Sequence, residues 1–242
     1  GLGSGAAVSV AIARALAKYF LTTEDSAKPP FGTGNTEKKN KKNVSVNSMS
    51  SLAKLSNEDI SALAYEVEKL HHGTPSGIDN TVIAFERPVY FIKGQPLETF
   101  RVARPFLIAI ADTGIASPTK IAVGDVRRAW ESDRERHEKI FDEIGGIARN
   151  ARDAIERGDV TSLGSLMLKN QDWLKKIGVS SPEIEEIIDA AVGAGAEGAK
   201  LSGAGRGGNV IALVDEETQD AERVERAISR AGAKRVIVTR VG

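Results

Sequence analysis

The chain has 242 residues, no cysteine and three histidines, and its 33 basic residues balance its 33 acidic ones. This length allows one large domain or two small ones with a substantial core. The missing cysteines exclude disulfides, thiolate metal sites and cysteine nucleophiles, and the balanced charge provides no long-range field that would favour nucleic acid or an acidic membrane. Small-molecule chemistry is the function class that the composition supports best.

The sequence contains neither a membrane span nor a secretory signal. No apolar run approaches the roughly 20 residues that cross a bilayer, and no charged and apolar leader stands at the start. We therefore expect a cytoplasmic protein. The chain starts at Gly1 rather than at methionine, in a glycine-rich turn that no strand precedes, so we expect an internal fragment or a processed chain.

The start of the chain predicts a turn followed by a helix. Apolar side chains recur at helical spacing up to about residue 20: Val8, Ile12, Ala15, Leu16 and Tyr19. Ser4 stands at the expected N-cap, and the small residues Gly5, Ala6 and Ala7 leave the first backbone N–H groups uncovered at the positive end of the helix dipole. A phosphate group would fit there.

Two other interpretations of this turn stay open. Gly1, Gly3 and Ala6 also satisfy a loose dinucleotide-binding fingerprint, and small residues at a helix start can serve close packing alone. The fingerprint requires a preceding strand and an acidic residue at the end of a second strand about 20 residues later. Glu24 and Asp25 instead follow a helix in a polar stretch, which counts against a dinucleotide site.

Residues 21–55 lose the helical pattern. They contain two adjacent prolines, a lysine and asparagine run at 38–43 and a serine-rich end, and they cannot bury enough apolar surface to order themselves. We expect a flexible insertion. The basic run is compatible with a solvated loop or with a mobile flap over an anionic ligand, and charge runs in general favour the solvated loop.

A second helix should begin at Ser56, a capping residue followed by acids in the first turn. Its predicted buried stripe consists of Ile60, Leu63, Ala64, Val67 and Leu70. Glu68 flanks this stripe near the C-terminal end of the helix, where the dipole disfavours an anion. This glutamate is either a surface residue or an acid that points into a pocket and holds a cation.

The stretch from Glu68 to Asn80 combines two glycines, a proline, two hydroxyls and a carboxylate. Gly73 and Gly77 permit positive φ or a close approach to a ligand, and the proline restricts the residue before it to an extended conformation. We expect a stiff loop that holds Asp79 where it can orient or deprotonate a substrate hydroxyl. The alternative is a tight turn in which Ser76 and Asp79 only bind the backbone.

The rest of the chain alternates strands and helices. The expected elements are strands at 89–92 and 106–111, helices at 119–132, 138–157, 160–176 and 182–192, strands at 199–201 and 210–214, a helix at 216–231 and a strand at 235–239. Ser181 and Pro182 fit the cap and the first position of the fourth helix. We interpret Trp130 and Trp173 as core or interhelical packing.

A glycine-rich stretch, Ser202 to Gly208, separates two of these strands. It has four glycines in six residues, which leaves no room for side chains and suits a loop that lies against a ligand or another backbone. A purely structural hairpin seldom needs so many.

These three stretches, in this order, resemble the GHMP kinase superfamily, and within it the branch that phosphorylates mevalonate. Residues 1–7 look like the family's phosphate-binding loop and helix, residues 72–80 like its central motif, and residues 200–208 like its third, glycine-rich motif. The resemblance covers essentially the whole chain. It implies transfer of phosphate from ATP to the primary alcohol of mevalonate, with Mg²⁺, in isoprenoid synthesis.

The resemblance also implies an α+β fold with two lobes. Residues 1–104 would form an incomplete N-terminal, ATP-binding domain that includes the insertion, and residues 105–242 a C-terminal domain of helices on an antiparallel sheet. The implied partner is a small-molecule substrate, mevalonate, with no nucleic acid and no membrane. A homodimer is compatible with the sequence.

Site residues follow from the same resemblance. Asp79 matches the catalytic aspartate, Glu68 matches the acid that binds Mg²⁺, and Ser4 lies in the serine-bearing phosphate and metal loop. The implied ATP-binding residues are Gly1, Leu2, Gly3, Ser4, Gly5, Ala6, Ala7, Gly203, Gly205 and Gly207. The implied substrate-binding residues are His72, Gly73, Thr74, Ser76, Gly77, Asp79, Ser202, Gly203 and Ala204. Such a set suits phosphoryl transfer, which requires positioning and charge neutralisation.

Two departures from the family pattern affect this site. Gly5 stands where members commonly carry a second serine tied to metal and phosphate, so metal binding would use Ser4 as a substitute or Glu68 alone. The family's first motif, with its lysine beside the catalytic aspartate, would lie upstream of Gly1. The alternatives are another GHMP kinase, acting on phosphomevalonate or a sugar, and a non-catalytic nucleotide-binding module.

Overall fold

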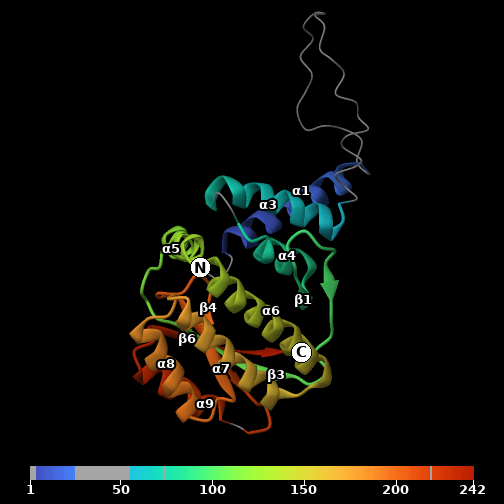
Figure 1. Ribbon diagram of the computed structural model, residues 1–242. Helices are drawn as coiled ribbons and strands as arrows, with labels where there is room; N and C mark the ends of the chain where they lie inside the picture. The colour runs from blue at the N-terminus through green and yellow to red at the C-terminus, as the bar shows by residue number, and fades with distance from the viewer. Residues whose placement is uncertain (1–3, 25–54, 73–74, 219) are drawn as a thin grey trace, which may run out of the picture. The chain divides into compact units, whose positions relative to one another are not determined.

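A computed structural model describes residues 4–24, 55–72, 75–218 and 220–242 of the chain (Figure 1). The chain divides into two compact units, Gly1–Thr99 and Phe100–Gly242. Each unit has its own core and is described by itself. Most of the predicted insertion, residues 25–54, lies outside the described residues.

Helices dominate the first unit. Its elements are α1 (Ser4–Glu24), α3 (Asn57–His72), α4 (Ile78–Phe85) and the short antiparallel strands β1 (Val89–Tyr90) and β2 (Glu98–Thr99). The three helices pack against one another around Val10, Ile60, Ala64 and Ala84. Helix α1 begins at Ser4 itself and runs to Glu24, whereas the sequence predicted Ser4 as its cap and an end near residue 20.

The predicted start of α3 is confirmed by a reciprocal cap. The Ser56 N–H donates to Oδ2 of Asp59 (2.9 Å), and the Asp59 N–H donates to Oγ of Ser56 (3.1 Å). Two orphan donors at the start of the helix are thereby satisfied. The hydrogen bonds from the Ser56 backbone and hydroxyl also lower the pKa of Asp59.

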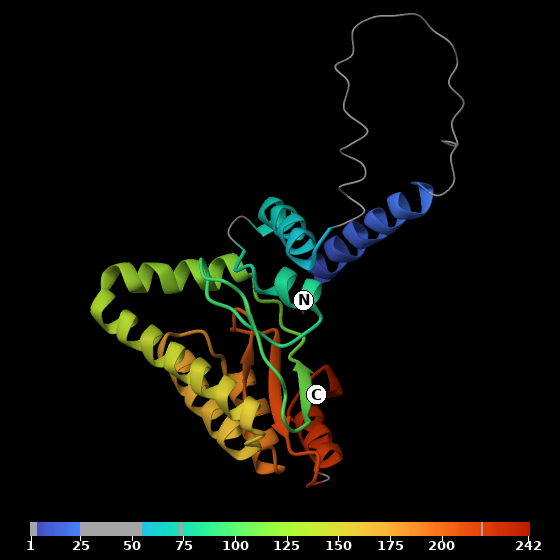
Figure 2. The ribbon, with the colours of Figure 1, turned by 90° about the vertical axis from the view of Figure 1, so that its right-hand side faces the viewer.

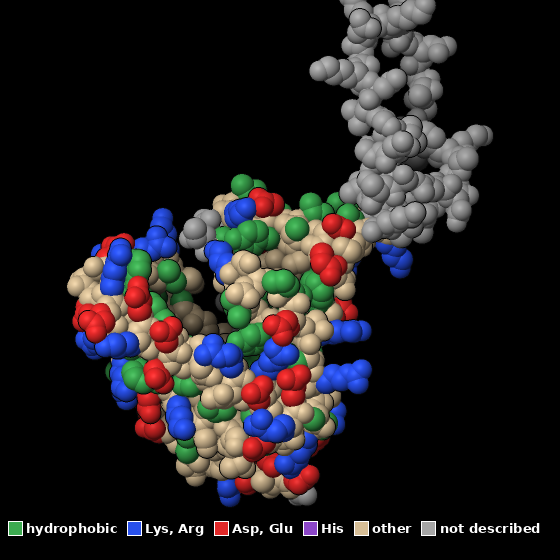
Figure 3. Space-filling model, turned by 45° about the vertical axis from the view of Figure 1, so that its right-hand side comes forward, with side chains coloured by type: hydrophobic (Ala, Val, Ile, Leu, Met, Phe, Trp, Pro, Cys, Tyr) green, Lys and Arg blue, Asp and Glu red, His purple; other side chains and the backbone are tan. Residues whose placement is uncertain are grey.

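The apolar stripe predicted for α3 is confirmed at Ile60 and Ala64 and wrong at its other residues, and the apolar side chains at helical spacing in α1 lie mostly outside. In α1 the residues that pack inward are Ala6 and Val10, whereas four predicted stripe residues are each more than half exposed: Val8, Ile12, Leu16 and Tyr19. In α3 the buried line runs through Ile60, Ala64 and Glu68, and three predicted stripe residues are exposed: Leu63, Val67 and Leu70. Small side chains let these helices approach closely, so the larger apolar ones remain outside, where Figure 3 shows hydrophobic side chains on the surface of this unit.

An antiparallel sheet with helices on both faces forms the second unit (Figures 1 and 2). The strand order is β4 (Gly198–Ser202), β5 (Asn209–Val214), β3 (Phe106–Asp112), β6 (Arg235–Val241). The helices are α5 (Thr119–Ser132), α6 (Arg134–Arg157), α7 (Val160–Lys176), α8 (Pro182–Gly193) and α9 (Ala221–Arg230). The predicted α+β class, with helices on an antiparallel sheet, is confirmed.

Alternation along the strands separates two cores. Phe106 and Leu213 join the cluster that holds α6 and α7, and Ala109 and Leu201 join the cluster that holds α8 and α9. Successive side chains of a strand point to opposite faces of the sheet, so each strand supplies residues to both clusters. Among the described residues, no helix is long and apolar enough to cross a membrane.

Several predicted boundaries needed correction. The helix expected at 216–231 begins only at Ala221, because Asp215 holds a turn in which it accepts hydrogen bonds from the Glu217 N–H (3.0 Å) and from the Thr218 N–H and hydroxyl. Helix α6 begins four residues earlier than expected, at Arg134, with Asp133 as its cap. Trp130 and Trp173 belong to none of the buried clusters. Trp130 on α5 makes the predicted interhelical contact, since Arg134 of α6 lies over its ring and its Nε1 donates to Oε1 of Glu138 on α6 (3.4 Å), and Lys176 lies over the ring of Trp173.

Helix α7 crosses strand β4 at an unusually short distance. A Cβ added to Gly164 would lie 2.7 Å from Cβ of Glu197, and a Cβ added to Gly198 would lie 2.7 Å from Cα of Gly164. Apolar carbons normally keep about 3.5–4.0 Å apart, so this crossing requires glycine on both elements.

Candidate functional site

The predicted site residues are shared between the two units. The first unit contributes the start of α1, the end of α3 and the start of α4, and the second contributes the loop between β4 and β5. Several predicted positions lie outside the described part of the chain: Gly1, Leu2, Gly3, Gly73, Thr74 and the side chains of Ser4 and His72.

Glu68 and Gly5 lie against each other where α3 ends and α1 begins. Glu68 is only 6% exposed, which excludes the interpretation of this residue as a surface acid. A Cβ added to Gly5 would lie 2.7 Å from Oε1 of Glu68. A serine at position 5 would therefore displace this carboxylate, so the glycine and the buried glutamate are matched to each other.

This pair fits a hard cation. Carboxylate oxygens are the protein ligands that Mg²⁺ prefers, and the ion commonly takes one or two of them and keeps water and phosphate oxygens for the rest. Glu68 supplies one buried carboxylate, and Gly5 places no side chain against it. Among the described residues, no group of three or more His, Asp or Glu side chains could enclose a metal by itself.

Asp79 lies in the first turn of α4, so the prediction of a loop extending to Asn80 is wrong. Gly77 precedes the helix with φ 89°, a left-handed conformation that favours glycine. A Cβ there would also meet the rings of Phe91 (3.3 Å) and Tyr65 (3.5 Å). The Ile78 N–H donates to Oγ of Ser76 (3.3 Å), which is the turn-stabilising role that the sequence left open for this serine.

Asn80 fixes the orientation of α4, a role that the sequence analysis missed. Its side chain is 4% exposed, and Nδ2 donates to the carbonyl oxygen (3.0 Å) and to Oγ (2.9 Å) of Ser61 on α3. Thr81 is also buried and donates to the Gly77 carbonyl oxygen (2.6 Å). Asp79 therefore projects from a fixed helix end with its carboxylate exposed, at the pole of the helix dipole that stabilises an anion.

Glycines of the loop between β4 and β5 fall into two groups. Gly205 and Gly207 are buried, and a Cβ on either would collide with a carbonyl oxygen, that of Val179 or that of Ile115. Gly203 is exposed with φ 97°, and no described atom outside its chain neighbours lies within 4 Å of its Cβ position. Two glycines thus serve backbone packing, whereas Gly203 faces open space.

The open part of this loop presents backbone donors. The N–H groups of Gly203, Ala204 and Gly205 form no hydrogen bond with the described residues. Successive N–H groups in a loop rich in left-handed residues form a concave site that suits an anion. The predicted contact with phosphate is compatible with this arrangement.

Lys200 stands on β4 immediately before the loop. Its Nζ donates to the Leu201 carbonyl oxygen (2.6 Å), and burial lowers its pKa to about 8. In the sequence, this lysine stands in a short apolar strand and at the start of the stretch that resembles the third family motif, but no role was predicted for it.

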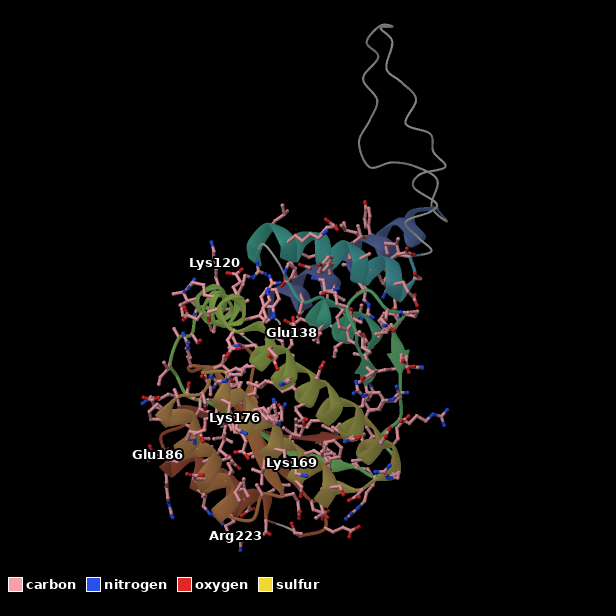
Figure 4. All side chains as sticks on the ribbon, viewed as in Figure 1. Lys120, Glu138, Lys169, Lys176, Glu186 and Arg223 are labelled. Carbon is pink, nitrogen blue, oxygen red and sulfur yellow. The ribbon has the colours of Figure 1, made fainter. Side chains whose placement is uncertain are left out.

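A cavity of about 420 Å³ lies elsewhere in the second unit, between α6 and α7. Its charged lining consists of Asp133, Glu135, Arg136, Lys139 and Lys176, of which Figure 4 labels Lys176. Nζ of Lys176 lies 3.7 Å from the ring centroid of Trp173. None of the predicted site residues lines it. We therefore assign candidate site residues in each unit by itself: the helix ends in the first unit and the glycine-rich loop in the second.

Residues 151–234 match the family model described as GHMP kinases C terminal. The curated mevalonate kinase of Aeropyrum pernix is 38% identical over 163 residues, which cover 67% of this chain and 50% of that protein. The curated mevalonate kinase of Pyrococcus horikoshii is 37% identical over 188 residues, which cover 74% of this chain and 53% of that protein. The chain spans about half the length of the curated relatives it matches.

Solved structures of mevalonate kinases are also similar to this chain. The crystal structure of L. major mevalonate kinase in complex with R-mevalonate has a TM-score of 0.70 at 30% identity, covering 78% of this chain and 59% of that one. A Streptococcus pneumoniae phosphomevalonate kinase has a TM-score of 0.67 at 15% identity, covering 81% of this chain and 65% of that one, which shows a shared fold alone.

Proposed function

We propose that this chain, a homologue of mevalonate kinases that carries a GHMP kinase C-terminal domain, is part of an enzyme that phosphorylates mevalonate with ATP. The observation that carries the proposal is the 38% identity to a curated mevalonate kinase over most of this chain. We assign residues 1–104 to an incomplete N-terminal, ATP-binding domain and residues 105–242 to the C-terminal domain. The product would be 5-phosphomevalonate, an intermediate of isoprenoid synthesis.

In the first unit, Asp79 would act on the substrate alcohol. Its exposed carboxylate at the start of α4 is available to orient the hydroxyl and accept its proton. Glu68 and the position of Ser4 at the start of α1 would hold Mg²⁺, which supplies neutralisation of phosphate charge when bound. The substrate would also contact His72, Gly73, Thr74, Ser76 and Gly77.

Backbone donors would carry phosphate recognition in both units. The first turn of α1, with Gly5, Ala6 and Ala7, has N–H groups without intrahelical partners. Ala6 itself is buried, so its contribution would come from the backbone. In the second unit, Ser202, Gly203 and Ala204 would contact the substrate, and Gly203, Gly205 and Gly207 would shape the loop beside the ATP phosphates.

The first experiment measures ADP release with mevalonate, Mg²⁺ and ATP. It compares this chain with the same chain joined to the part of the Aeropyrum pernix relative that this chain does not match. Turnover by either form with mevalonate supports the proposal. Turnover with only phosphomevalonate or galactose would establish a different acceptor, and ATP binding without turnover in both forms would favour a non-catalytic nucleotide-binding module.

A matched pair of variants tests the role of Asp79. Asp79→Asn should abolish turnover in the active form and lower the free energy of unfolding by at most about 1 kcal/mol, because the carboxylate is exposed and the helix dipole stabilises it by no more than that. Glu58→Gln, which alters an exposed acid in the first turn of α3, should keep parental turnover. Parental rates in Asp79→Asn would refute the assigned role.

A further inference from the structure

Arg206 occupies a backbone conformation that favours glycine. Its φ is 58°, and among the described residues only Glu86 and Arg206 combine a side chain with a positive φ. The left-handed conformation is disfavoured for every residue with a Cβ, because Cβ approaches the following carbonyl oxygen. Four glycines surround Arg206 in the same loop, so a side chain at this position requires a compensating role.

The contacts of Arg206 link the loop to two other segments of the second unit. Its N–H donates to the Val179 carbonyl oxygen (2.7 Å), and its Nε donates to the Gly178 carbonyl oxygen (3.0 Å). Its Nη1 forms an ion pair with Asp125 on α5. A single residue thus ties the loop to the connection between α7 and α8 and to helix α5.

A second set of bonds holds the loop from the opposite side. The Gly205 carbonyl oxygen accepts a hydrogen bond from Oγ of Ser117, and the Gly208 N–H donates to the Ile115 carbonyl oxygen (3.0 Å). The Gly208 carbonyl oxygen also accepts from the Thr113 N–H (2.9 Å). Residues 205–208 are therefore fixed on both sides, while the N–H groups of Gly203 and Ala204 form no hydrogen bond with the described residues.

We infer that Arg206 is a positioning residue that orients the backbone N–H groups of Gly203 and Ala204 to bind a phosphate group. It acts through Val179, Gly178 and Asp125 and does not need to touch the ligand. Preorganised donors bind an anion more tightly than mobile ones, because the ordering of the loop is complete before the ligand arrives. The inference rests on the proposed function, since the phosphate would belong to ATP or to a phosphorylated acceptor.

Four variants separate positioning from general stability. Arg206→Gly removes the side-chain ties but relieves the backbone, Arg206→Lys keeps the charge without the fork of donors, and Asp125→Asn weakens the pair from the α5 side. Arg128→Ala is the matched control, because Arg128 also pairs with Asp125 but forms no hydrogen bond or ion pair with the described residues of the loop. Each variant is made in the full chain.

Two readouts follow the loop itself. Heteronuclear NOE values report the order of the Gly203 and Ala204 amides, and titrations with tripolyphosphate, ATP and phosphomevalonate give dissociation constants. In Arg206→Gly we expect lower NOE values at both amides and about tenfold weaker phosphate binding, with an unfolding midpoint equal to or above that of the parent. Arg206→Lys and Asp125→Asn should lie between, and Arg128→Ala should match the parent. The three ligands distinguish a nucleotide phosphate from an acceptor phosphate.

Parental NOE values and affinity in Arg206→Gly would overturn the inference. A loss of affinity that tracks a lower unfolding midpoint, and that Arg128→Ala shares, would also overturn it, because it would indicate a merely structural effect. If the parent binds none of the three ligands, the proposed function fails, and the NOE comparison still decides whether Arg206 orders the loop.

Discussion

Because α7 crosses β4 so closely, we predict that a glycine-to-alanine substitution changes the free energy of unfolding in opposite directions at two helix positions. Gly164→Ala should destabilise the second unit, and Gly145→Ala should stabilise it. Both glycines lie inside long helices, α7 and α6. At Gly145 the nearest atom to an added Cβ is Nη1 of Arg149 at 3.9 Å, an ordinary contact with a flexible side chain. At Gly164 the added Cβ meets the backbone and Cβ of Glu197.

The magnitudes follow from these distances. Alanine is favoured over glycine inside a helix by about 1 kcal/mol, so Gly145→Ala should gain roughly that amount. At Gly164 the 2.7 Å separation from Cβ of Glu197 must open by about 1 Å to reach an ordinary carbon contact. Overpacking costs about 1–3 kcal/mol, and the cost here should be near the upper value because neither backbone can rotate away. After subtraction of the gain of about 1 kcal/mol from helix propensity, Gly164→Ala should lower the free energy of unfolding by about 2 kcal/mol.

Tryptophan fluorescence isolates the relevant transition, because both tryptophans, Trp130 and Trp173, belong to the second unit. Urea titrations should give a lower midpoint for Gly164→Ala and a higher one for Gly145→Ala. In thermal unfolding, we expect a decrease of about 4–8 °C for the first and an increase of about 2–4 °C for the second. Stabilisation by Gly164→Ala equal to that of the control would refute the close crossing.

Three further predictions concern the loop and its supports. Burial lowers the pKa of Lys200 to about 8 in the folded chain, so between pH 8 and 10.5 the unfolded chain holds a proton that the folded chain has released. The free energy of unfolding should therefore rise with pH by up to about 1.4 kcal/mol per unit in that range. Lys200→Met should lack this slope in urea titrations across the same range. Gly205→Ala should lower the free energy of unfolding by about 1 kcal/mol more than Gly208→Ala in the same titrations. Both glycines have positive φ, but only a Cβ at Gly205 collides with the Val179 carbonyl oxygen and breaks the hydrogen bond that this oxygen accepts. Equal losses would contradict the packing role of Gly205. Gln171→Leu should cost about 1–3 kcal/mol and speed hydrogen exchange at the Leu201 amide, which donates to Oε1 of the buried glutamine; unchanged exchange would reject that bond.

Elements with strong local signals could be predicted from the sequence. Helix α7 was predicted from Val160 to Lys176 and has those bounds, with Asp159 accepting a hydrogen bond from the Ser162 N–H (3.0 Å). Helix α4 was missed because its first residues follow a glycine and carry polar side chains typical of a turn. Its stability comes from Asn80 and Ser61, a contact between separate segments that local propensity does not encode.

The candidate site shows the same division. The glycine-rich loop and Asp79 could be proposed as site residues from composition and spacing, and their roles stay predictions. The burial of Glu68 could not, because a glutamate near the end of a helix is usually exposed, and its neighbour Gly5 lies far away in the sequence. The exposed apolar stripe of α1 was misjudged for a related reason: the period reveals which side chains share a face but not which face is covered.

One part of the glycine-rich loop is packed and the other part is exposed, and the exposed part makes the chain suitable for site-specific labelling. The sequence has no cysteine, so Ala204→Cys would introduce a unique thiol at a half-exposed position beside Gly203. An environment-sensitive fluorophore attached there would lie next to the free backbone N–H groups. Its emission would report occupation of the loop directly, in equilibrium titrations and in stopped-flow mixing, without any need for turnover.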